Sequence, residues 1–349
     1  MSAQPAPRAT PLSYVELAPP APGETVPLAP GVHWLRMPLP MELDHINLWL
    51  LEHDGGFVLI DTGLASDAAR AAWERLESGI LRERPLRLIV VTHLHPDHAG
   101  LAAWLQNRHH VPVWTSRTTE RQMRELLTPL ADAEIDRRRD FYRAHGVTDL
   151  DFLRASLTGE RYRAAMSGAP EVAHHPRDDE QTDWTGRTWR WLETNGHAAG
   201  HLCLHDAAGR ILVAGDQILP AISPNVSLNG WPADPDPLDS YLASLERLGA
   251  LDPATLALPS HGRPFRGLPA RALELRRHHQ NHLELLLAAC VTPQSAVELL
   301  RVLYRRELTG FHRVLALGEA LAHLEYLARR QCLVRSTGPD GIVRYGLAP

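Results

Sequence analysis

Short apolar runs that end in small or polar residues recur along the chain. Four of these runs lie at residues 57–60, 88–91, 211–214 and 256–259. Aliphatic and β-branched runs bounded by turn residues predict buried strands. Residues 68–81 and 100–108 have the apolar spacing of amphipathic helices. The alternation of strands and helices predicts an α/β fold.

The pattern changes at residue 119, where charge becomes dense and leucines are spaced as on amphipathic helices. We predict a helical insertion at residues 119–180, within a catalytic domain at residues 32–265. Residues 1–31 are rich in Pro and Ala and predict an extended lead-in. The insertion either roofs the functional site and selects its ligand or serves as a structural or dimerising cover.

The last region, residues 266–349, is called the tail below. It carries long apolar-spaced segments at residues 270–289 and 311–330, which predict helices, and two short strands that flank residues 337–341. Helices followed by a terminal two-stranded hairpin are typical of a winged-helix domain. The sequence Thr292-Pro293-Gln294 carries a capping signal and predicts a helix start between the two long helices.

The first long helix of the tail is rich in histidine. It contains His278, His279 and His282. We expect these imidazoles to be solvated or hydrogen-bonded on one helix face rather than to bind a metal.

The strongest chemical signal follows the apolar run at residues 88–91. His93, His95, Asp97 and His98 lie within six residues, and no cysteine is close to them. Imidazole nitrogens and carboxylate oxygens suit Zn(II), Fe(II) or Mn(II). Such a density of ligand-type side chains predicts a metal site at the end of a strand, where α/β sheets place their sites.

Two further predicted strands end in the same residue types. Asp216 follows Ala214 and Gly215, and His261 follows the run at residues 256–259. Because strand ends can meet at one edge of a sheet, we expect these side chains near the histidine cluster. Taken alone, His261 or His197 would be interpreted as a hydrogen-bonded loop histidine.

Five segments resemble the metallo-β-lactamase superfamily and follow its order over roughly residues 30–265. The family's His-x-His-x-Asp-His loop is matched in full at residues 93–98, and residues 196–201 are similar to its Gly-His-x-x-Gly-His segment. The remaining three are similar to its Asp-Thr-Gly strand end, its bridging carboxylate and its last ligand loop, and lie at residues 57–63, 214–216 and 259–262. The resemblance implies a four-layer αβ/βα sandwich and a ligand set like that of hydroxyacylglutathione hydrolases.

The resemblance also implies roles for individual residues. It assigns His93, His95 and His197 to a first metal ion. It assigns Asp97, His98 and His261 to a second ion, with Asp216 bridging both. Asp97 would also orient the attacking hydroxide that bridges the two ions, and is the predicted catalytic residue. Asp61 is expected to hold a ligand imidazole through its other nitrogen, and His201 either does the same or caps the following strand.

Composition agrees with this interpretation and adds little. The net charge is −5, hydrophobic residues make up 44% of the chain, and no apolar run has the length of a membrane span. Three widely separated cysteines form neither a disulfide framework nor a C-x-x-C site. No secretory leader is visible, so we expect a cytoplasmic protein without membrane association.

The preferred function is a dinuclear-metal hydrolase of a small ester or thioester, with Zn(II) first and Fe(II) or Mn(II) as alternatives. The loop after Asp216 offers Asn225 and Trp231 as candidate substrate contacts. A non-catalytic binding protein is disfavoured, because the full set of metal ligands would then have no catalytic use. A β-lactamase is disfavoured, because many zinc lactamases offer a cysteine where this chain has Asp216.

The alternative is a metal-dependent endoribonuclease or phosphodiesterase that uses the tail to contact nucleic acid. The tail holds twelve Arg against seven acidic residues. Its leucines belong mostly to a packed face, and it lacks an aromatic stacking platform for single-stranded RNA. Structural or dimerising use of the tail is therefore favoured, and both a monomer and a homodimer stay open.

Overall fold

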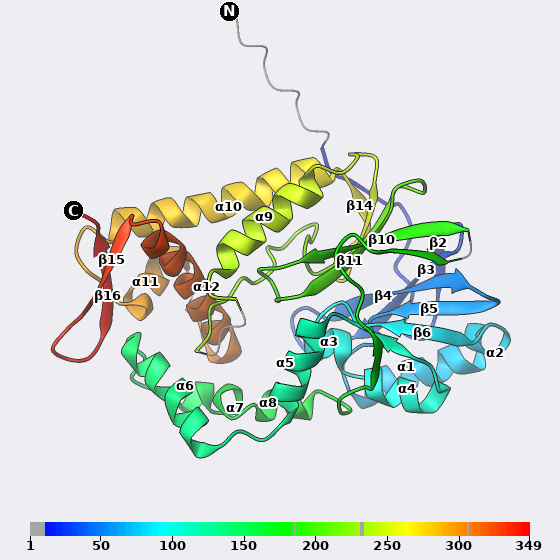
Figure 1. Ribbon diagram of the computed structural model, residues 1–349, viewed down its shortest axis with the longest axis horizontal. Helices are drawn as coiled ribbons and strands as arrows, with labels where there is room; N and C mark the ends of the chain where they lie inside the picture. Colours follow the sequence, from blue (N-terminus) through cyan, green and yellow to red (C-terminus); the bar gives the residue numbers. More distant parts are fainter. Residues whose placement is uncertain (1–10, 185, 231–233, 306) are drawn as a thin grey trace, which may run out of the picture.

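The computed structural model describes residues 11–184, 186–230, 234–305 and 307–349. Its described strands form two seven-stranded sheets and one two-stranded sheet (Figure 1). The first sheet has the order β2-β3-β4-β5-β6-β7-β8. Its strands are β2 (Val26–Ala29), β3 (Val32–Pro38), β4 (His45–His53), β5 (Gly56–Ile60), β6 (Leu86–Val90), β7 (Val113–Trp114) and β8 (Val172–His174).

The second sheet has the order β1-β14-β13-β12-β11-β10-β9. Its strands are β1 (Ser13–Tyr14), β9 (Gln181–Trp184), β10 (Arg187–Thr194), β11 (His201–Asp206), β12 (Ile211–Gly215), β13 (Leu256–Pro259) and β14 (Phe265–Arg266). In the first sheet β5, β6, β7 and β8 pair in parallel, and in the second sheet β12 pairs in parallel with β13. The carboxyl ends of each parallel pair therefore lie at one edge of its sheet.

Helices pack outside the sheets and fill the insertion and the tail. Those of the first part of the chain are α1 (Asp67–Ser78), α2 (Ile80–Glu83), α3 (Pro96–Ala99) and α4 (Ala102–His109). Those of the insertion are α5 (Arg117–Leu127), α6 (Asp132–Ala144), α7 (Arg154–Leu157) and α8 (Glu160–Ala164), with a 3-10 turn at Asp151–Leu153. The others are α9 (Pro237–Gly249), α10 (Leu268–Ala289), α11 (Ala296–Leu303) and α12 (Gly310–Arg329).

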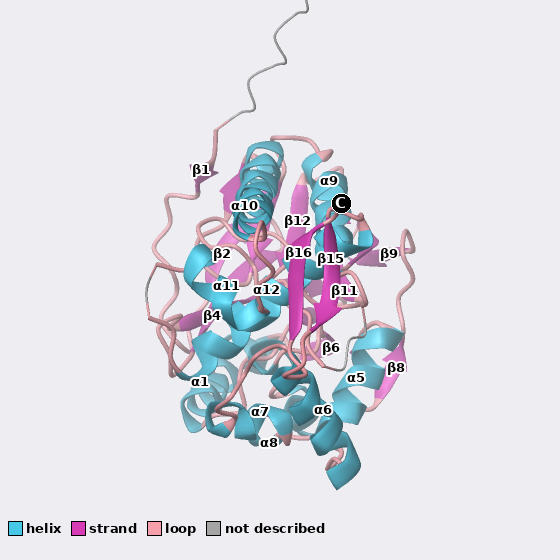
Figure 2. Cartoon of the chain, turned by 90° about the vertical axis from the view of Figure 1, so that its left-hand side faces the viewer, coloured by secondary structure: helices cyan, strands magenta, loops and turns pink. Residues whose placement is uncertain are grey.

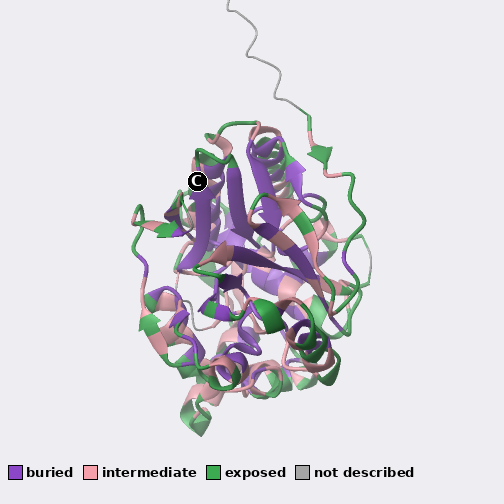
Figure 3. Ribbon diagram, turned by 90° about the vertical axis from the view of Figure 1, so that its right-hand side faces the viewer, coloured by how far each residue is buried: buried purple, intermediate pink, exposed green. Residues whose placement is uncertain are grey.

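Alternation along the strands sends apolar side chains to both faces of each sheet. Trp34 and Trp49 of the first sheet pack with Trp191 of the second in a cluster between the sheets. Their neighbours on the other face of the first sheet pack around Trp73 of α1, and the outer face of the second sheet packs against α9 and α10. Figure 3 shows the resulting purple core of buried strands. Burial on both faces explains why the central strands are continuous apolar runs.

Two parts of the predicted lead-in belong to the sheets. Ser13–Tyr14 (β1) pairs with β14, and Val26–Ala29 (β2) pairs with β3. An edge strand offers unpaired backbone groups that such short segments satisfy. The sequence predicted the extended conformation of these segments but not their pairing with β14 and β3.

The insertion is helical between residues 117 and 164, but Val172–His174 (β8) is the last strand of the first sheet. This strand has only three residues, all exposed or partly buried, so its sequence shows little apolar pattern and did not indicate an edge strand. The insertion runs beneath the sheets and the tail in Figure 1.

The tail consists of α10, α11, α12 and the antiparallel hairpin of β15 (Leu333–Thr337) and β16 (Val343–Leu347), which faces the viewer in Figure 2. The element order matches the predicted helices and hairpin. Helix α11 begins later than predicted, with Ser295 as its N-cap. Among the described residues no helix combines the length and apolar character needed to cross a bilayer.

Candidate metal centre

The predicted ligands come together where strands of both sheets end. Thr92 and His93 follow β6, and Asp97 and His98 lie on the short helix α3. Four further residues come from other connections of the chain. Asp61 follows β5, His197 lies between β10 and β11, Asp216 follows β12, and His261 follows β13.

The side chains form two groups, each compact enough to hold one metal ion. The first is made of His93, His95, His197 and Asp216, and the second of Asp97, His98 and His261. The Asp216 carboxylate faces both groups. Its Oδ2 lies 3.5 Å from the Nε2 atoms of His197 and His98, and its Oδ1 lies 3.5 Å from Nε2 of His261.

Hydrogen bonds fix which nitrogen of each imidazole faces the cluster. Nδ1 of His197 donates to the carbonyl of Asn225 (2.9 Å), and Nδ1 of His261 donates to the carbonyl of His45 (2.8 Å). Because a carbonyl only accepts, both rings carry a proton at Nδ1, and Nε2 is the nitrogen that faces the cluster.

Asp61 holds the remaining part of the cluster from behind. Its Oδ2 accepts from Nδ1 of His98 (2.7 Å), and its Oδ1 accepts from the backbone N–H of Thr92 (2.8 Å). The Thr92 hydroxyl donates to the same carboxylate and accepts from Nδ1 of His93 (3.0 Å). One buried carboxylate thus orients imidazoles of both groups, as carboxylates behind metal-bound histidines do.

His201 supports the bridging position rather than an imidazole. Its ring is fully buried, and Nε2 accepts from the backbone N–H of Asp216 (3.2 Å) while Nδ1 meets the hydroxyl of Thr194 (3.1 Å). Gly215 has φ +53°, and a Cβ at that position would collide with the His201 ring. The glycine before Asp216 is therefore required by this close approach.

Electrostatics keeps the first group neutral and the bridge ionised. Burial, followed by the neighbouring imidazoles of His98 and His95, lowers the pKa of His93 well below its usual value. Burial also lowers the pKa of His95 to about 3. Burial alone would raise the pKa of Asp216, but the positively charged rings of His261 and His98 hold it well below its ordinary range. The carboxylates in turn outweigh burial and raise the pKa of His261 to about 10 and that of His98 well above its usual value. Neutral imidazoles and ionised carboxylates are the forms that bind metals, so a metal ion in the second group would displace protons from His98 and His261.

Two buried atoms that lack a hydrogen-bond partner indicate that these residues fit a metal ion. Among the described residues, Nε2 of His98 and Oδ1 of Asp216 are buried and accept or donate no hydrogen bond. Buried polar atoms are nearly always satisfied. Both atoms face the interior of the cluster, where a divalent cation would satisfy them.

The two predicted substrate contacts differ in outcome. The backbone carbonyl of Asn225 lies behind His197, and its side chain accepts from Ser227 and donates to the carbonyl of Leu315 on α12. Asn225 therefore contacts the cluster through its backbone carbonyl, and its role as a substrate contact stays a prediction. Trp231 lies outside the described residues.

His45 was missed by the sequence analysis. Its carbonyl holds His261, and its Nε2 accepts from the backbone N–H of Gly262 (3.0 Å). Because any residue type supplies a backbone carbonyl, no sequence pattern indicated that His45 holds His261.

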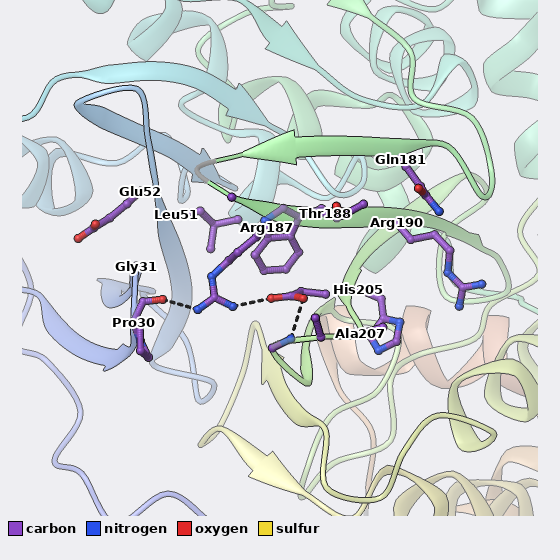
Figure 4. Close-up of a pocket in the computed structure, with 15 residues that line it drawn as sticks. Pro30, Gly31, Leu51, Glu52, Gln181, Arg187, Thr188, Arg190, His205 and Ala207 are labelled. Atoms are coloured by element: carbon purple, nitrogen blue, oxygen red, sulfur yellow. Dashed lines mark hydrogen bonds and ion pairs between the residues drawn. The ribbon is translucent and has the colours of Figure 1, made fainter.

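A pocket of about 980 Å³ lies elsewhere, against the far end of the second sheet (Figure 4). Arg187 crosses it, bonded to the carbonyl of Pro30 and to Asp206. None of the candidate ligands lines this pocket. The pocket lies at the opposite end of the strands from the candidate ligands, so we assign it no role at the metal centre.

Comparison with known proteins agrees with the geometry. Residues 41–261 match the model of the Metallo-beta-lactamase superfamily, and residues 283–348 match that of the Metallo-beta-lactamase-like, C-terminal domain. The chain belongs to the metallo-beta-lactamase superfamily, and it is a metallo-hydrolase with His/Asp clusters able to bind metal ions.

Similar solved structures cover nearly the whole chain. A beta-lactamase domain protein from Burkholderia ambifaria is 38% identical with a TM-score of 0.88, over 97% of this chain and 98% of that one. The metallo-beta-lactamase family protein TTHA1429 from Thermus thermophilus is 32% identical with a TM-score of 0.77, over 91% and 99%.

Curated relatives are more distant. The probable metallo-hydrolase YqjP from Bacillus subtilis is 25% identical, over 86% of this chain and 92% of its own length. The acyl-coenzyme A thioesterase MBLAC2 from Bos taurus is 28% identical, over 68% and 80%.

Proposed function

We propose that this chain is a dinuclear-metal hydrolase of a small ester or thioester. The observation that carries the proposal is the position of Asp216 between two groups of candidate ligands. Its two oxygens face imidazoles of both groups at 3.5 Å. Such an arrangement suits a carboxylate shared by two ions about 3.5–4 Å apart.

Each residue has a definite task in this proposal. His93, His95 and His197 hold one ion, Asp97, His98 and His261 hold the other, and Asp216 bridges them. When bound, the two ions lower the pKa of water and polarise a carbonyl oxygen. Asp97, whose Oδ2 lies 3.3 Å from Nε2 of His261, would both bind the second ion and orient the attacking oxygen. Asp61 and Thr92 keep the imidazoles of His93 and His98 aligned.

The donor set favours Zn(II), with Fe(II) and Mn(II) as alternatives. It contains imidazole nitrogens and carboxylate oxygens and no thiolate within the two groups. Such mixed sites accept all three metals, and availability decides among them.

Two observations support a small acyl substrate. The relative MBLAC2 is named an acyl-coenzyme A thioesterase. The two arginines of the terminal hairpin, which a nuclease would direct at phosphates, are paired instead. Arg335 lies 3.1 Å from Glu325, and Arg344 lies 2.6 Å from Asp340. Cytoplasmic location and a homodimer stay predictions.

A parallel activity screen tests the proposal. One set of reactions contains lactoylglutathione, acyl-coenzyme A thioesters and p-nitrophenyl acetate. The other contains single-stranded RNA and a phosphodiester. We expect chelator-sensitive hydrolysis of an ester or thioester that returns when Zn(II), Fe(II) or Mn(II) is added, with intact RNA. Chelator-sensitive cleavage of RNA with no acyl hydrolysis would replace the proposal with the nuclease.

A further inference from the structure

A second histidine cluster lies where α10, α12 and the end of α11 meet, on the side of the molecule that carries the terminal hairpin (Figure 1). His278 and His282 are one turn apart on α10, and Glu319 faces them from α12. Oε1 of Glu319 lies 4.0 Å from Nε2 of His278 and 3.8 Å from Nδ1 of His282. These three atoms are close enough together to share one ion.

The glutamate is held in the orientation a ligand needs. The Tyr304 hydroxyl donates to its Oε2 (2.9 Å), which leaves Oε1 directed at the two imidazoles. The Glu319 side chain is only 13% exposed. Among the described residues, no arginine lies within ion-pair distance of it. Burial raises the pKa of Glu319 to about 7, and a metal ion bound beside it would keep the carboxylate ionised.

The wall behind these residues is a second buried histidine pair. Nδ1 of His323 donates to the carbonyl of Glu319 (2.7 Å), so its Nε2 accepts from Nδ1 of His279 (3.0 Å). Both rings are fully buried. His279, His323 and Glu319 also lie close enough together to hold an ion, but both ring nitrogens of His323 are already engaged in hydrogen bonds.

Unsatisfied nitrogens mark the cluster as incomplete. Among the described residues, Nδ1 of His282 and Nε2 of His279 are buried and have no hydrogen-bond partner. Nδ1 of His282 is the atom that faces Oε1 of Glu319. A lone pair left unpartnered beside a carboxylate is the arrangement expected of a ligand.

We propose that His278, His282 and Glu319 bind one divalent transition-metal ion of the Zn(II) type, separate from the metal centre at the strand ends. Two imidazole nitrogens and one carboxylate oxygen suit such an ion. Ligands bound to zinc at about 2.0–2.1 Å lie roughly 3.4 Å apart, so small side-chain shifts bring the three atoms into place. The side chain of His278 is 40% exposed, which gives the ion a path from solvent and leaves room for a water ligand.

The ion would join α10 to α12 and stabilise the packing of the tail. The pattern His-x-x-x-His on α10 supplies two ligands one turn apart, as helical metal sites do. The expectation from sequence, that these histidines are only hydrogen-bonded, lacked the third ligand, which comes from α12 about forty residues later in the chain.

Equilibrium dialysis of the full chain against Zn(II), with metal analysis, tests the site. We expect the His282→Ala and Glu319→Gln variants each to bind about one equivalent less Zn(II) per chain than the parent. His312→Ala, an exposed histidine on the same helix α12, serves as the matched control and should bind as the parent does. Acyl hydrolysis by the His282→Ala variant should be unchanged.

Thermal unfolding gives a second measurement. Zn(II) should raise the Tm of the parent more than that of His282→Ala, because an ion that binds the folded state stabilises it. Equal Zn(II) content in the parent and both folded variants would overturn the site. This result would leave the strand-end centre untouched, because the test depends only on the difference between chains that share that centre.

Discussion

At the scale of single residues, the candidate centre depends as much on hydrogen bonds behind the imidazoles as on the imidazoles themselves. The identities of the ligands could be predicted, because His93, His95, Asp97 and His98 stand together in the sequence. The acceptors behind His197 and His261 could not. They are the backbone carbonyls of Asn225 and His45, and any residue type supplies a carbonyl.

Asp61 is the exception, because here a side chain rather than a backbone carbonyl accepts the hydrogen bond from a ligand imidazole. The residue also directly follows a predicted strand, so the sequence could indicate it. Its φ of +62° is in the left-handed region, which asparagine also adopts readily. Asp61→Asn therefore keeps the backbone but removes the negative charge that accepts from Nδ1 of His98. We expect metal affinity to fall about 10–100-fold, measured by competition with a chromophoric chelator.

A matched control for this variant is Asp54→Asn. Asp54 also has a positive φ, of 45°, but lies exposed in the turn between β4 and β5. It should bind metal as the parent does. Unchanged affinity in Asp61→Asn would show that Asp61 only holds the backbone of Thr92.

At the scale of elements, the start of α11 shows how tertiary pairing selects among local signals. Two capping patterns overlap here, one beginning at Thr292 and the other at Ser295. Gln294 pairs with Tyr345 of the terminal hairpin, through bonds of 3.1 and 2.8 Å. This pairing keeps the residues before Ser295 extended, so the helix begins at the second signal. Only Ser295 is followed three residues later by a glutamate, the capping-box pattern that our prediction from Thr292 overlooked.

Ser295 makes a full capping box with Glu298. Removing it by Ser295→Ala should lower the free energy of unfolding by about 1 kcal/mol. Thr292→Ala, at the exposed position from which we predicted the helix, should change it by less than ~0.5 kcal/mol. Urea unfolding of both variants makes the comparison, and a larger effect at Thr292 would contradict the observed cap.

At the scale of the whole molecule, the insertion and the tail pack together beside the centre. Leu153 and Leu157 of the insertion lie in the same buried cluster as Leu299 and Tyr345 of the tail. The Tyr162 hydroxyl donates to the carbonyl of Leu94 in the histidine loop (2.8 Å). The insertion thus contacts both the tail and the loop that carries the candidate ligands.

Local pattern predicted the α/β core, because buried strands are short apolar runs and their ends carry the chemistry. It predicted the contacts between regions poorly, because amphipathic helices such as α6 and α7 show that a face is buried but not against which partner. The same limit hid Glu319 from the histidines of α10. The contact between the insertion and the histidine loop agrees with a role in substrate selection, which stays a prediction.

We propose that the strand-end cluster holds the metal that hydrolysis requires. Metal content and acyl hydrolysis measured together on His95→Ala and Asp216→Ala test it most directly, with His174→Ala, a partly exposed histidine outside the cluster, as the control. We expect both variants to fold, to lack the strand-end metal and to lose more than about 100-fold of the activity, a larger loss than that expected for a residue behind a ligand. His174→Ala should match the parent. Full turnover in both variants would contradict it.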